Sequence, residues 1–235
     1  MVMSNVECRD HCVMRGNCEI DDVTYLNRPC VYNGDPVTLK DQYAIKFLKE
    51  VCPTLETGGD FNVCCDADQV SIFQESFDAL AVLFKRCPSC YHNLANLFCN
   101  LICSPRQNQF LKVTDFKTDG ENKTVTEISY YITEAFAQGL FKSCKNVKLS
   151  FTKEKAIGIS CGSHIRDCTP HLWLAYMGGH DPSPYQINFY FEKNDFVMIN
   201  EEAFYPMNKT IVPCSRAVRP HGPACSRMDC PRRHH

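Results

Sequence analysis

The residues in this sequence best suited to chemistry are its 17 cysteines among 235 positions. Cys87-Pro-Ser-Cys90 and Cys99-x-x-x-Cys103 have the spacing of half-sites in zinc modules, which bind the metal through four ligands in one compact cluster. The cysteines here run instead from Cys8 to Cys230, and 17 thiolates would need about four separate metals. The sequence therefore predicts disulfides and no metal site, which indicates an oxidising compartment.

Two enzyme-like patterns also occur. Cys87–Cys90 resembles a redox pair, but that chemistry needs a strand–helix–strand setting and an exposed thiol of low pKa. Gly158-Ile-Ser-Cys-Gly162 matches the G-x-S-x-G elbow of hydrolases, which needs a strand before the serine and a helix after it. Residues 163–168 form a short polar loop instead of a helix. We therefore interpret the motif as a turn and expect no enzymatic activity.

Gln69 is the single polar residue of most interest. Asp66-Ala-Asp-Gln69 has the form of a capping box, in which the glutamine side chain accepts a hydrogen bond from a backbone N–H. Gln69 also borders an apolar helical stripe, where its amide would both donate to and accept from a ligand hydroxyl. The residues alone leave both interpretations open.

The other polar motifs form no site. The eight histidines do not gather at metal spacing, and there is no glycine-rich phosphate loop. The sequons at Asn122 and Asn208 predict N-glycosylation in a secreted or luminal domain.

The elements that must position these residues are mainly helices. Apolar residues recur at helical spacing in four segments, and they alternate with polar ones in residues 187–191. The predicted helices cover residues 41–51, 66–86, 89–102, 133–144 and 170–177, and the predicted strands cover 113–117, 125–132 and 187–191. The segment 8–32 is expected to be rich in loops, and the segment after Pro206 to be an irregular tail. The fold class is therefore α+β, a helix-rich single domain with a small mixed β-sheet.

Composition excludes several classes of protein. A net charge of −2 argues against a nucleic-acid partner. Fifteen phenylalanines and ten tyrosines are enough to order a core. The longest apolar run, residues 79–84, is far shorter than a membrane helix, and residues 1–8 contain no signal peptide. We expect the chain to be a piece of a longer protein of the secretory pathway.

One region makes a family resemblance visible. Cys87-Pro-Ser-Cys-Tyr-His-Asn-Leu-Ala-Asn-Leu-Phe-Cys99, followed by Cys103-Ser-Pro-Arg-Gln-Asn-Gln-Phe-Leu111, closely resembles the N-terminal luminal domain of the Niemann-Pick type C membrane proteins, the type-one transporter and its paralogues. Further matches cover nearly the whole chain: Cys12-x5-Cys18, Cys64-Cys65-Asp66, Tyr130-Tyr131, Trp173-x-x-Tyr176-Met177 and Pro223-Ala-Cys225-Ser.

The resemblance implies a domain with an internal apolar pocket. It implies that the domain binds cholesterol or a related sterol with the hydroxyl end buried, and hands it on without chemistry or cofactor. The implied partners are the soluble type-two Niemann-Pick sterol carrier and the remaining domains of the parent transporter. The implied location is the late endosome or lysosome, or the plasma membrane for an uptake paralogue. The alternative is a cysteine-rich extracellular module that binds another small apolar ligand or a vitamin, as in folate-receptor-like domains.

The resemblance also assigns residues. The glutamine that binds the sterol hydroxyl in the family falls on Gln69. Its asparagine partner falls on Pro29, which has neither an amide side chain nor an N–H, so Asn17 and Asn27 are the candidates for that polar role. The implied pocket residues are Met14, Phe73, Ser76, Tyr91, Phe98 and Ile102. The implied entrance residues are Ile128, Tyr130, Ile159, Tyr176, Met177, Pro184, Tyr185 and Ile187.

The same resemblance implies eight disulfides. They are Cys12–Cys64, Cys18–Cys30, Cys52–Cys99, Cys65–Cys103, Cys87–Cys225, Cys90–Cys144, Cys161–Cys168 and Cys214–Cys230. A ninth family bridge is missing, because Arg227 stands at one of its cysteines. Cys8 has no expected partner, so it is either free or links two chains.

The expected organisation has three parts: an N-terminal extension over residues 1–11, a sterol-binding domain over 12–205, and a disulfide-stapled, proline-rich tail over 206–235. One interpretation of His234-His235 is the remnant of a purification tag. Segments 159–165 and 177–185, rich in glycine or proline, are expected to move when the pocket opens.

Overall fold

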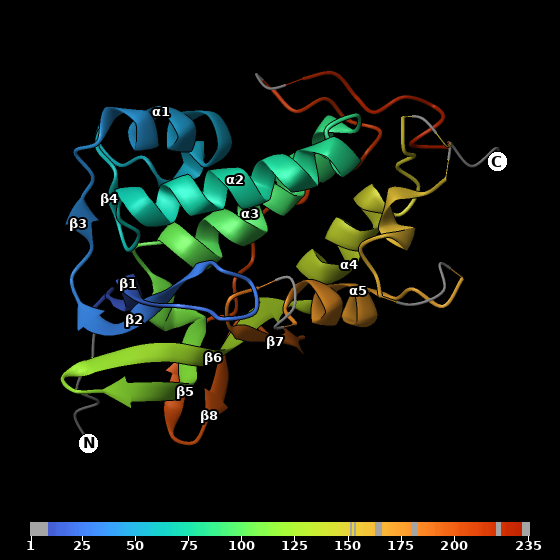
Figure 1. Cartoon of the computed structure of the whole chain (residues 1–235). Coiled ribbons are helices and arrows are strands. Elements are labelled where there is room, and N and C mark those ends of the chain that lie inside the picture. The colour runs from blue at the N-terminus through green and yellow to red at the C-terminus, as the bar shows by residue number, and fades with distance from the viewer. Residues whose placement is uncertain are drawn as a thin grey trace, which may run out of the picture.

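A computed structural model describes residues 9–150, 152, 154–162, 166–179, 183–219 and 222–231 of the chain. A layer of helices lies across one side of a twisted sheet, with α1 outermost, α2 and α3 side by side beneath it, and α4 and α5 near one end of the sheet (Figure 1). Within the described residues the α-helices are α1 (Gln42–Val51), α2 (Ala67–Phe84), α3 (Pro88–Cys103), α4 (Glu134–Cys144) and α5 (Pro170–Met177). All five predicted helices are confirmed.

The start of α2 is fixed by a capping box. Asp66 Oδ1 accepts a hydrogen bond from Gln69 N at 2.9 Å, and Gln69 Oε1 accepts one from Asp66 N at 3.1 Å. The helix ends at Phe84, and Pro88 takes the first turn of α3, where its missing N–H leaves no bond unmade. The predicted break between the two helices is therefore confirmed.

The main sheet is mixed. Its strands are β1 (Cys12–Ile20), β2 (Asn27–Gly34), β5 (Leu111–Asp119), β6 (Asn122–Thr133) and β7 (Gln186–Glu192). Antiparallel pairs give the order β1-β2-β6-β5, and β7 pairs in parallel with β6, opposing Ile128 to Ile187 and Tyr130 to Phe189. Two small antiparallel pairs complete the strands: β3 (Val37–Thr38) with β4 (Asn62–Val63), and β8 (Val197–Ile199) with β9 (Glu202–Phe204).

The expectation that residues 8–32 are rich in loops is wrong, because β1 and most of β2 lie there. Their register shifts between Arg15 and Glu19, where Gly16 adopts a φ of +73°. Such a bulge destroys the alternation of apolar and polar residues by which a strand is recognised in a sequence. The cysteines and Pro29 in this hairpin obscure the pattern further.

Three 3₁₀ turns complete the described elements: η1 (Pro53–Leu55), η2 (Gln107–Gln109) and η3 (Ala156–Gly158). The predicted strands 113–117 and 125–132 are confirmed, although β5 and β6 extend further, to a tight turn at Gly120.

Aromatic rings pack the three helices of the upper layers together. Phe73 of α2 lies 5.4 Å from Phe47 of α1, and Phe77 lies 4.8 Å from Tyr91 and 6.5 Å from Phe98 of α3. Edge-to-face and tilted pairs at these centroid distances stabilise a core beyond the area that they bury. These ring contacts hold α1 and α3 against α2.

All eight predicted disulfides are confirmed by the structure. Four of them join α3 or its N-cap residue to other segments: Cys52–Cys99 to the end of α1, Cys65–Cys103 to the start of α2, Cys90–Cys144 to α4 and Cys87–Cys225 to the tail. Helix α3 is therefore the central anchor of the crosslinks. Cys8 lies outside the described residues.

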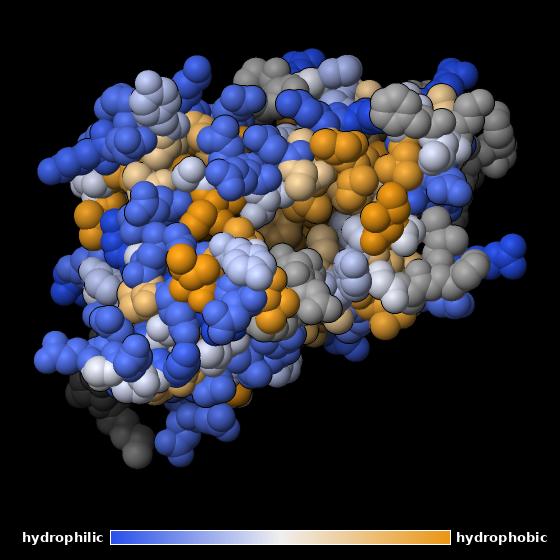
Figure 2. All heavy atoms as spheres, viewed as in Figure 1, coloured by the Kyte–Doolittle hydropathy of each residue, from blue (hydrophilic) through white to orange (hydrophobic). Residues whose placement is uncertain are grey.

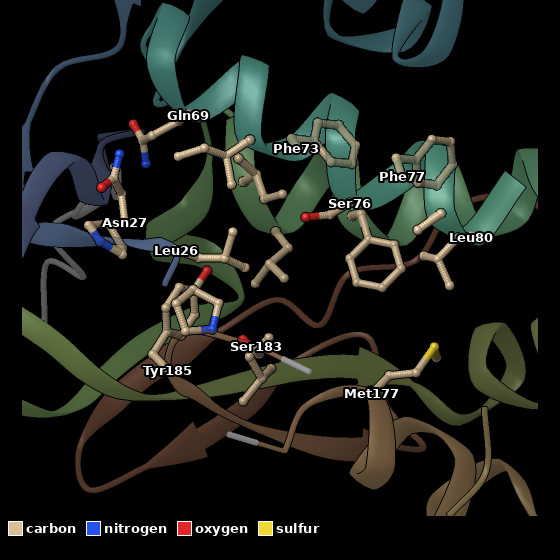
Figure 3. Close-up of a pocket in the computed structure, with 18 of the residues that line it drawn as sticks. Leu26, Asn27, Gln69, Phe73, Ser76, Phe77, Leu80, Met177, Ser183 and Tyr185 are labelled. Carbon is tan, nitrogen blue, oxygen red and sulfur yellow. The ribbon is translucent and has the colours of Figure 1, made fainter. Parts of the chain in front are cut away.

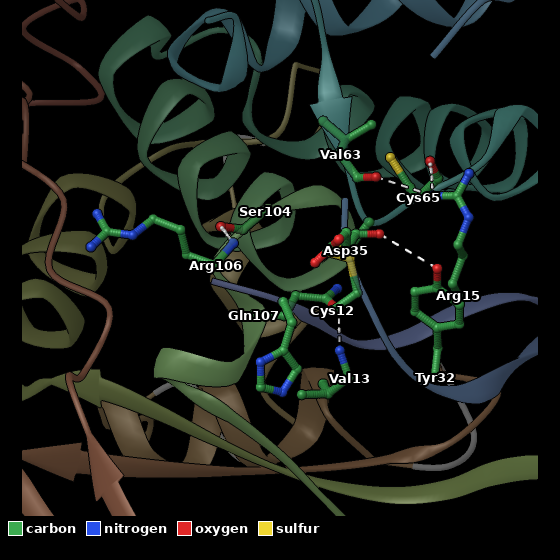
Figure 4. The surroundings of a disulfide bond; sticks show 12 residues. Cys12, Val13, Arg15, Tyr32, Asp35, Val63, Cys65, Ser104, Arg106 and Gln107 are labelled. Atoms are coloured by element: carbon green, nitrogen blue, oxygen red, sulfur yellow. Dashed lines mark hydrogen bonds between the residues drawn. A yellow bond between two sulfur atoms is a disulfide. The ribbon is translucent and has the colours of Figure 1, made fainter. Parts of the chain in front are cut away.

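The Cys12–Cys64 bridge joins β1 to the segment that leads into α2. Beside it, Val13 N donates to Gln107 Oε1 at 3.1 Å, and Arg15 donates to the carbonyls of Val63 and Cys65 at 3.1 Å each (Figure 4). These contacts hold β1 against the N-terminal end of α2.

After Pro206 the described chain is largely irregular, as predicted, and runs along α3, where Val212 N donates to Asn93 Oδ1 at 3.0 Å. None of the described helices combines the length and the apolar character that a bilayer crossing would require.

Candidate ligand-binding cavity

A cavity of about 400 Å³ lies between α2 and the sheet. In the space-filling view the surface is hollowed among hydrophobic side chains (Figure 2), and the close-up shows side chains from α2 facing those of the β1–β2 hairpin and the segment before β7 (Figure 3). The lining residues are Met14, Leu26, Asn27, Pro29, Gln69, Ile72, Phe73, Ser76, Phe77, Ala79, Leu80, Leu83, Phe98, Leu101, Ile102, Ser160, Tyr176, Met177, Ser183, Pro184, Tyr185 and Ile187. None of these side chains carries a formal charge, so the cavity suits a neutral ligand.

One face of α2 forms the longest wall. Gln69, Ile72, Ser76, Leu80 and Leu83 line it and follow one another by three or four residues, which places them on one side of a helix. The wall from Gln69 to Leu83 is about 21 Å long, at 1.5 Å per residue. Gln69 therefore marks one end of an elongated apolar channel.

The Gln69 amide combines both roles that the sequence suggested. Its Oε1 accepts from Asp66 N at 3.1 Å and from Gly16 N at 2.8 Å. Two backbone N–H donors can be served only by the oxygen, so the amide orientation is determined. Among the described residues Nε2 has no hydrogen-bond partner, and it remains as a donor at the cavity wall.

Gly16 makes this arrangement possible. Its φ of +73° is a conformation that glycine adopts without strain and most other residues avoid. The resulting bulge in β1 brings Gly16 N to the Gln69 oxygen. A bulged residue of β1, distant from Gln69 in the sequence, thus controls which atom of the Gln69 amide is available.

Asn27 lies at the same end of the cavity, with its amide close to that of Gln69 (Figure 3). Its side chain has no hydrogen-bond partner within the described part of the chain, and Pro29 lines the wall next to it. Asn17, by contrast, is exposed on β1 and does not line the cavity. Of the three predicted polar residues, the structure brings Gln69 and Asn27 together.

Five of the six predicted pocket residues line the cavity: Met14, Phe73, Ser76, Phe98 and Ile102. Tyr91 does not; its ring packs against that of Phe77, with the ring centroids 4.8 Å apart. Partial burial, with Asp78 and Glu50 nearby, raises the pKa of Tyr91 to about 12. Tyr91 is therefore a neutral core residue rather than part of the wall.

Of the predicted entrance residues, Tyr176, Met177, Pro184, Tyr185 and Ile187 line the cavity. Burial raises the pKa of Tyr185, so its phenol stays neutral. The other three lie elsewhere. Ile128 and Tyr130 are fully buried in β6, where the Tyr130 hydroxyl donates to Leu97 O at 3.0 Å, and Ile159 is 56% exposed.

The remaining lining residues were missed: Leu26, Ile72, Phe77, Ala79, Leu80, Leu83, Leu101, Ser160 and Ser183. Those on α2 could have been found from the sequence, because counting by three and four residues from Gln69 reaches Ile72, Leu80 and Leu83. The others come from loops and from α3, which only the folded chain brings to the cavity.

Ser160, the central residue of the hydrolase-like motif, accepts a hydrogen bond from Trp173 Nε1 at 2.9 Å. The residues before it form a 3₁₀ turn, η3, where a nucleophile elbow requires a strand. Gly162 has a φ of +61°, and a Cβ there would collide with the Tyr176 ring. The motif thus forms a turn that packs against α5, as interpreted from the sequence.

Both sequons are accessible to modification. Asn122 is exposed at the start of β6, next to the β5–β6 turn. Asn208 is exposed as well, and its side chain hydrogen-bonds to Thr133 and Asp195. Among the residues placed by the structure, no group of three or more histidine, cysteine, aspartate or glutamate side chains is arranged to hold a metal ion.

Comparison with known proteins identifies relatives. Residues 9–233 match the sequence profile described as the Niemann-Pick C1 N terminus. The chain is 34% identical over 230 residues to the NPC intracellular cholesterol transporter 1 of Sus scrofa, covering 93% of this chain and 17% of the relative. It is 29% identical over 237 residues to the NPC intracellular cholesterol transporter 1 homolog 1 of Caenorhabditis elegans, covering 93% and 17%. It is 27% identical over 213 residues to the human NPC1-like intracellular cholesterol transporter 1, covering 88% and 16%. The chain therefore spans about a sixth of the length of these relatives.

Proposed function

Since this chain belongs to the Niemann-Pick C1 N-terminal domain family, we propose that it binds cholesterol or a related sterol in the cavity beneath α2, with the sterol hydroxyl at Gln69. The observation that carries the proposal is an uncharged, elongated cavity with a free amide donor at one end. A sterol is a rigid apolar body with a single hydroxyl, and it needs such a wall and few polar partners.

The orientation follows from the Gln69 amide. Because Oε1 is occupied by two backbone N–H groups, Nε2 donates and the sterol oxygen accepts. Asn27 lines the cavity at the same end as Gln69 (Figure 3), and its amide oxygen is the candidate acceptor for a hydrogen bond from the sterol hydroxyl. The sterol rings then lie along Ile72, Phe73 and Ser76, and the alkyl tail lies toward Leu80 and Met177.

The role in the whole protein is proposed from the names of the relatives, which are cholesterol transporters. We propose that residues 12–205 act as a luminal or extracellular sterol-binding domain of a membrane transporter, followed by the crosslinked tail. The domain would receive sterol from a soluble carrier of the type-two Niemann-Pick kind and pass it on without altering it. The late endosome or lysosome is the compartment for an exporter, and the plasma membrane for an uptake protein.

The test is equilibrium binding of three ligands that differ only at carbon 3: cholesterol, the corresponding 3-ketone and the analogue without oxygen. We expect cholesterol to bind, and the analogue without oxygen to bind about 10- to 100-fold more weakly, because the Nε2 donor is left unpaired. The ketone should bind more tightly than the oxygen-free analogue, because it still accepts from Nε2.

Folate and a fatty acid serve as competitors in the same assay. If either displaces bound cholesterol at lower concentration than unlabelled cholesterol does, the sterol is not the preferred ligand and the alternative of another apolar ligand or a vitamin is favoured. Equal affinity for the three sterol analogues would contradict the assignment of the polar end.

A further inference from the structure

Arg28 connects two walls of the cavity that are far apart in the sequence. It lies on β2 between Asn27 and Pro29, which both line the hairpin wall. Its Nε donates to the carbonyl of Pro184 at 2.6 Å, across a sequence separation of 156 residues. Pro184 and Tyr185 line the neighbouring wall, and both walls face α2 across the cavity (Figure 3).

The guanidinium of Arg28 is held in place by carboxylates. Its Nη2 pairs with Asp21 Oδ2, and the Asp21 side chain is only 1% exposed. Glu19 Oε2 lies 3.7 Å from Nη1. A planar guanidinium carries its N–H donors on three separate nitrogens in a fixed fork, so Nη2 and Nε can each reach a different acceptor. The donors of an ammonium radiate from one nitrogen, which cannot occupy both of these positions.

Asp21 is itself fixed by its own turn. Its Oδ1 accepts from Thr24 N at 2.7 Å, from Thr24 Oγ1 at 2.8 Å and from Val23 N at 3.2 Å. The position of Pro184 is therefore determined by a rigid turn acting through Arg28. The chain around Pro184 is also tied to the end of α5, through Ser183 N to Gly179 O at 3.1 Å and Ile187 N to Gly178 O at 2.7 Å, and β7 pairs with β6 from Gln186 onward.

We infer that Arg28 is a positioning residue that clamps the Pro184 segment, residues 183–187, against the β1–β2 hairpin and so limits how fast a ligand enters and leaves the cavity. The inference rests on the proposed function, since it concerns the same cavity. It assigns the control of exchange to a charged residue that does not line the cavity.

The experiment measures association and dissociation of radiolabelled cholesterol with the wild-type chain and with Arg28→Lys. Lysine keeps a charge near Asp21 but cannot also donate to Pro184 O in the same geometry. We expect both rate constants to rise about tenfold, the size of one charge-assisted hydrogen bond, while the equilibrium affinity changes less. A dissociation rate within twofold of the wild-type value would overturn the inference.

Arg86→Lys is the matched control. Arg86 Nη2 lies 3.5 Å from Asp229 Oδ2, and the Asp229 side chain is 1% exposed, but neither residue lines the cavity. This variant also weakens a pair with a buried carboxylate, and it should leave both rate constants unchanged. Faster exchange in both variants would indicate a general loss of stability and would contradict a specific clamp.

Hydrogen exchange of the ligand-free chain keeps the two proposals separable. Arg28→Lys should speed exchange of the Ser183 and Ile187 amides, whereas Arg86→Lys should not; unchanged exchange in Arg28→Lys would overturn the clamp. If the wild-type chain binds no sterol, the proposed function fails, and this measurement still decides the clamp.

Should Arg28→Lys not fold, Asp21→Asn replaces it, because it removes the carboxylate charge and leaves an Oδ1 for the turn.

Discussion

At the scale of single residues, Gln69 shows that a structural and a functional role need not exclude each other. The capping box and the bond from Gly16 occupy its oxygen, and this leaves its nitrogen for a ligand. The sequence predicted the cap from a local pattern. It could not predict that Gly16, 53 residues away, supplies the second donor, because a β-bulge is not visible in the order of side chains.

Gln69→Ala is expected to weaken cholesterol binding by about 1–3 kcal/mol, since the sterol oxygen loses its donor. It should also lower the free energy of unfolding, because Asp66 N and Gly16 N lose their acceptor. Isothermal titration and chemical denaturation measure the two effects separately.

Asp66→Ala is the control for the cap. It removes the acceptor of Gln69 N and should cost about 1 kcal/mol of stability, but it keeps the Gln69 amide. If Asp66→Ala weakens sterol binding as much as Gln69→Ala does, then helix capping accounts for the effect and Gln69 is not the anchor.

At the scale of elements, the helices were predictable and the hairpin was not. Apolar spacing indicated four of the five helices, α1 to α4, because each buries a stripe against a neighbour. In α2 the apolar residues have two roles: Val70 and Phe84 are buried in the core only, whereas Phe73 and Phe77 are buried and also line the cavity. A sequence pattern cannot distinguish a side chain that packs against other side chains from one that lines a cavity, since both are apolar.

Leu80→Trp is expected to reduce cholesterol binding by more than tenfold while the chain still folds. Leu80 lines the cavity and is half-buried, so a larger side chain occupies ligand space rather than overpacking the closed core. Val82→Trp on the same helix is the control, because Val82 is 77% exposed and does not line the cavity. Equal binding by the two variants would show that the α2 wall is not where the ligand lies.

At the scale of the whole molecule, disulfides connect α3 and its N-cap residue to four other segments of the chain. No cysteine spacing in the sequence could determine which cysteines pair; the pairing came from the family resemblance, and the structure confirms it. The bridges to α3 hold α1, α4, the start of α2 and the tail around one helix. Asn17, Tyr91 and Ile159 were placed near the cavity by resemblance alone, and their positions depend on side-chain directions that only the folded chain defines.

The two bridges of the tail should differ in their contribution to stability. Cys87–Cys225 spans 138 residues and Cys214–Cys230 spans 16. In the loop-entropy account the longer closure stabilises the fold by up to about 2 kcal/mol more. We therefore expect the Cys87→Ala/Cys225→Ala pair to lower the free energy of unfolding more than Cys214→Ala/Cys230→Ala, as measured by denaturant titration. The opposite order would show that strain or local contacts outweigh loop closure.

The division of labour between α2 and α3 has a consequence for divergence. Helix α3 carries Cys90, Cys99 and Cys103, whereas α2 contains no cysteine and provides the cavity wall. Substitutions on α2 can therefore alter the shape of the ligand site without removing a crosslink. The crosslinked scaffold and the shape of the ligand site can therefore change independently, in a chain that is 27–34% identical to the relatives described above.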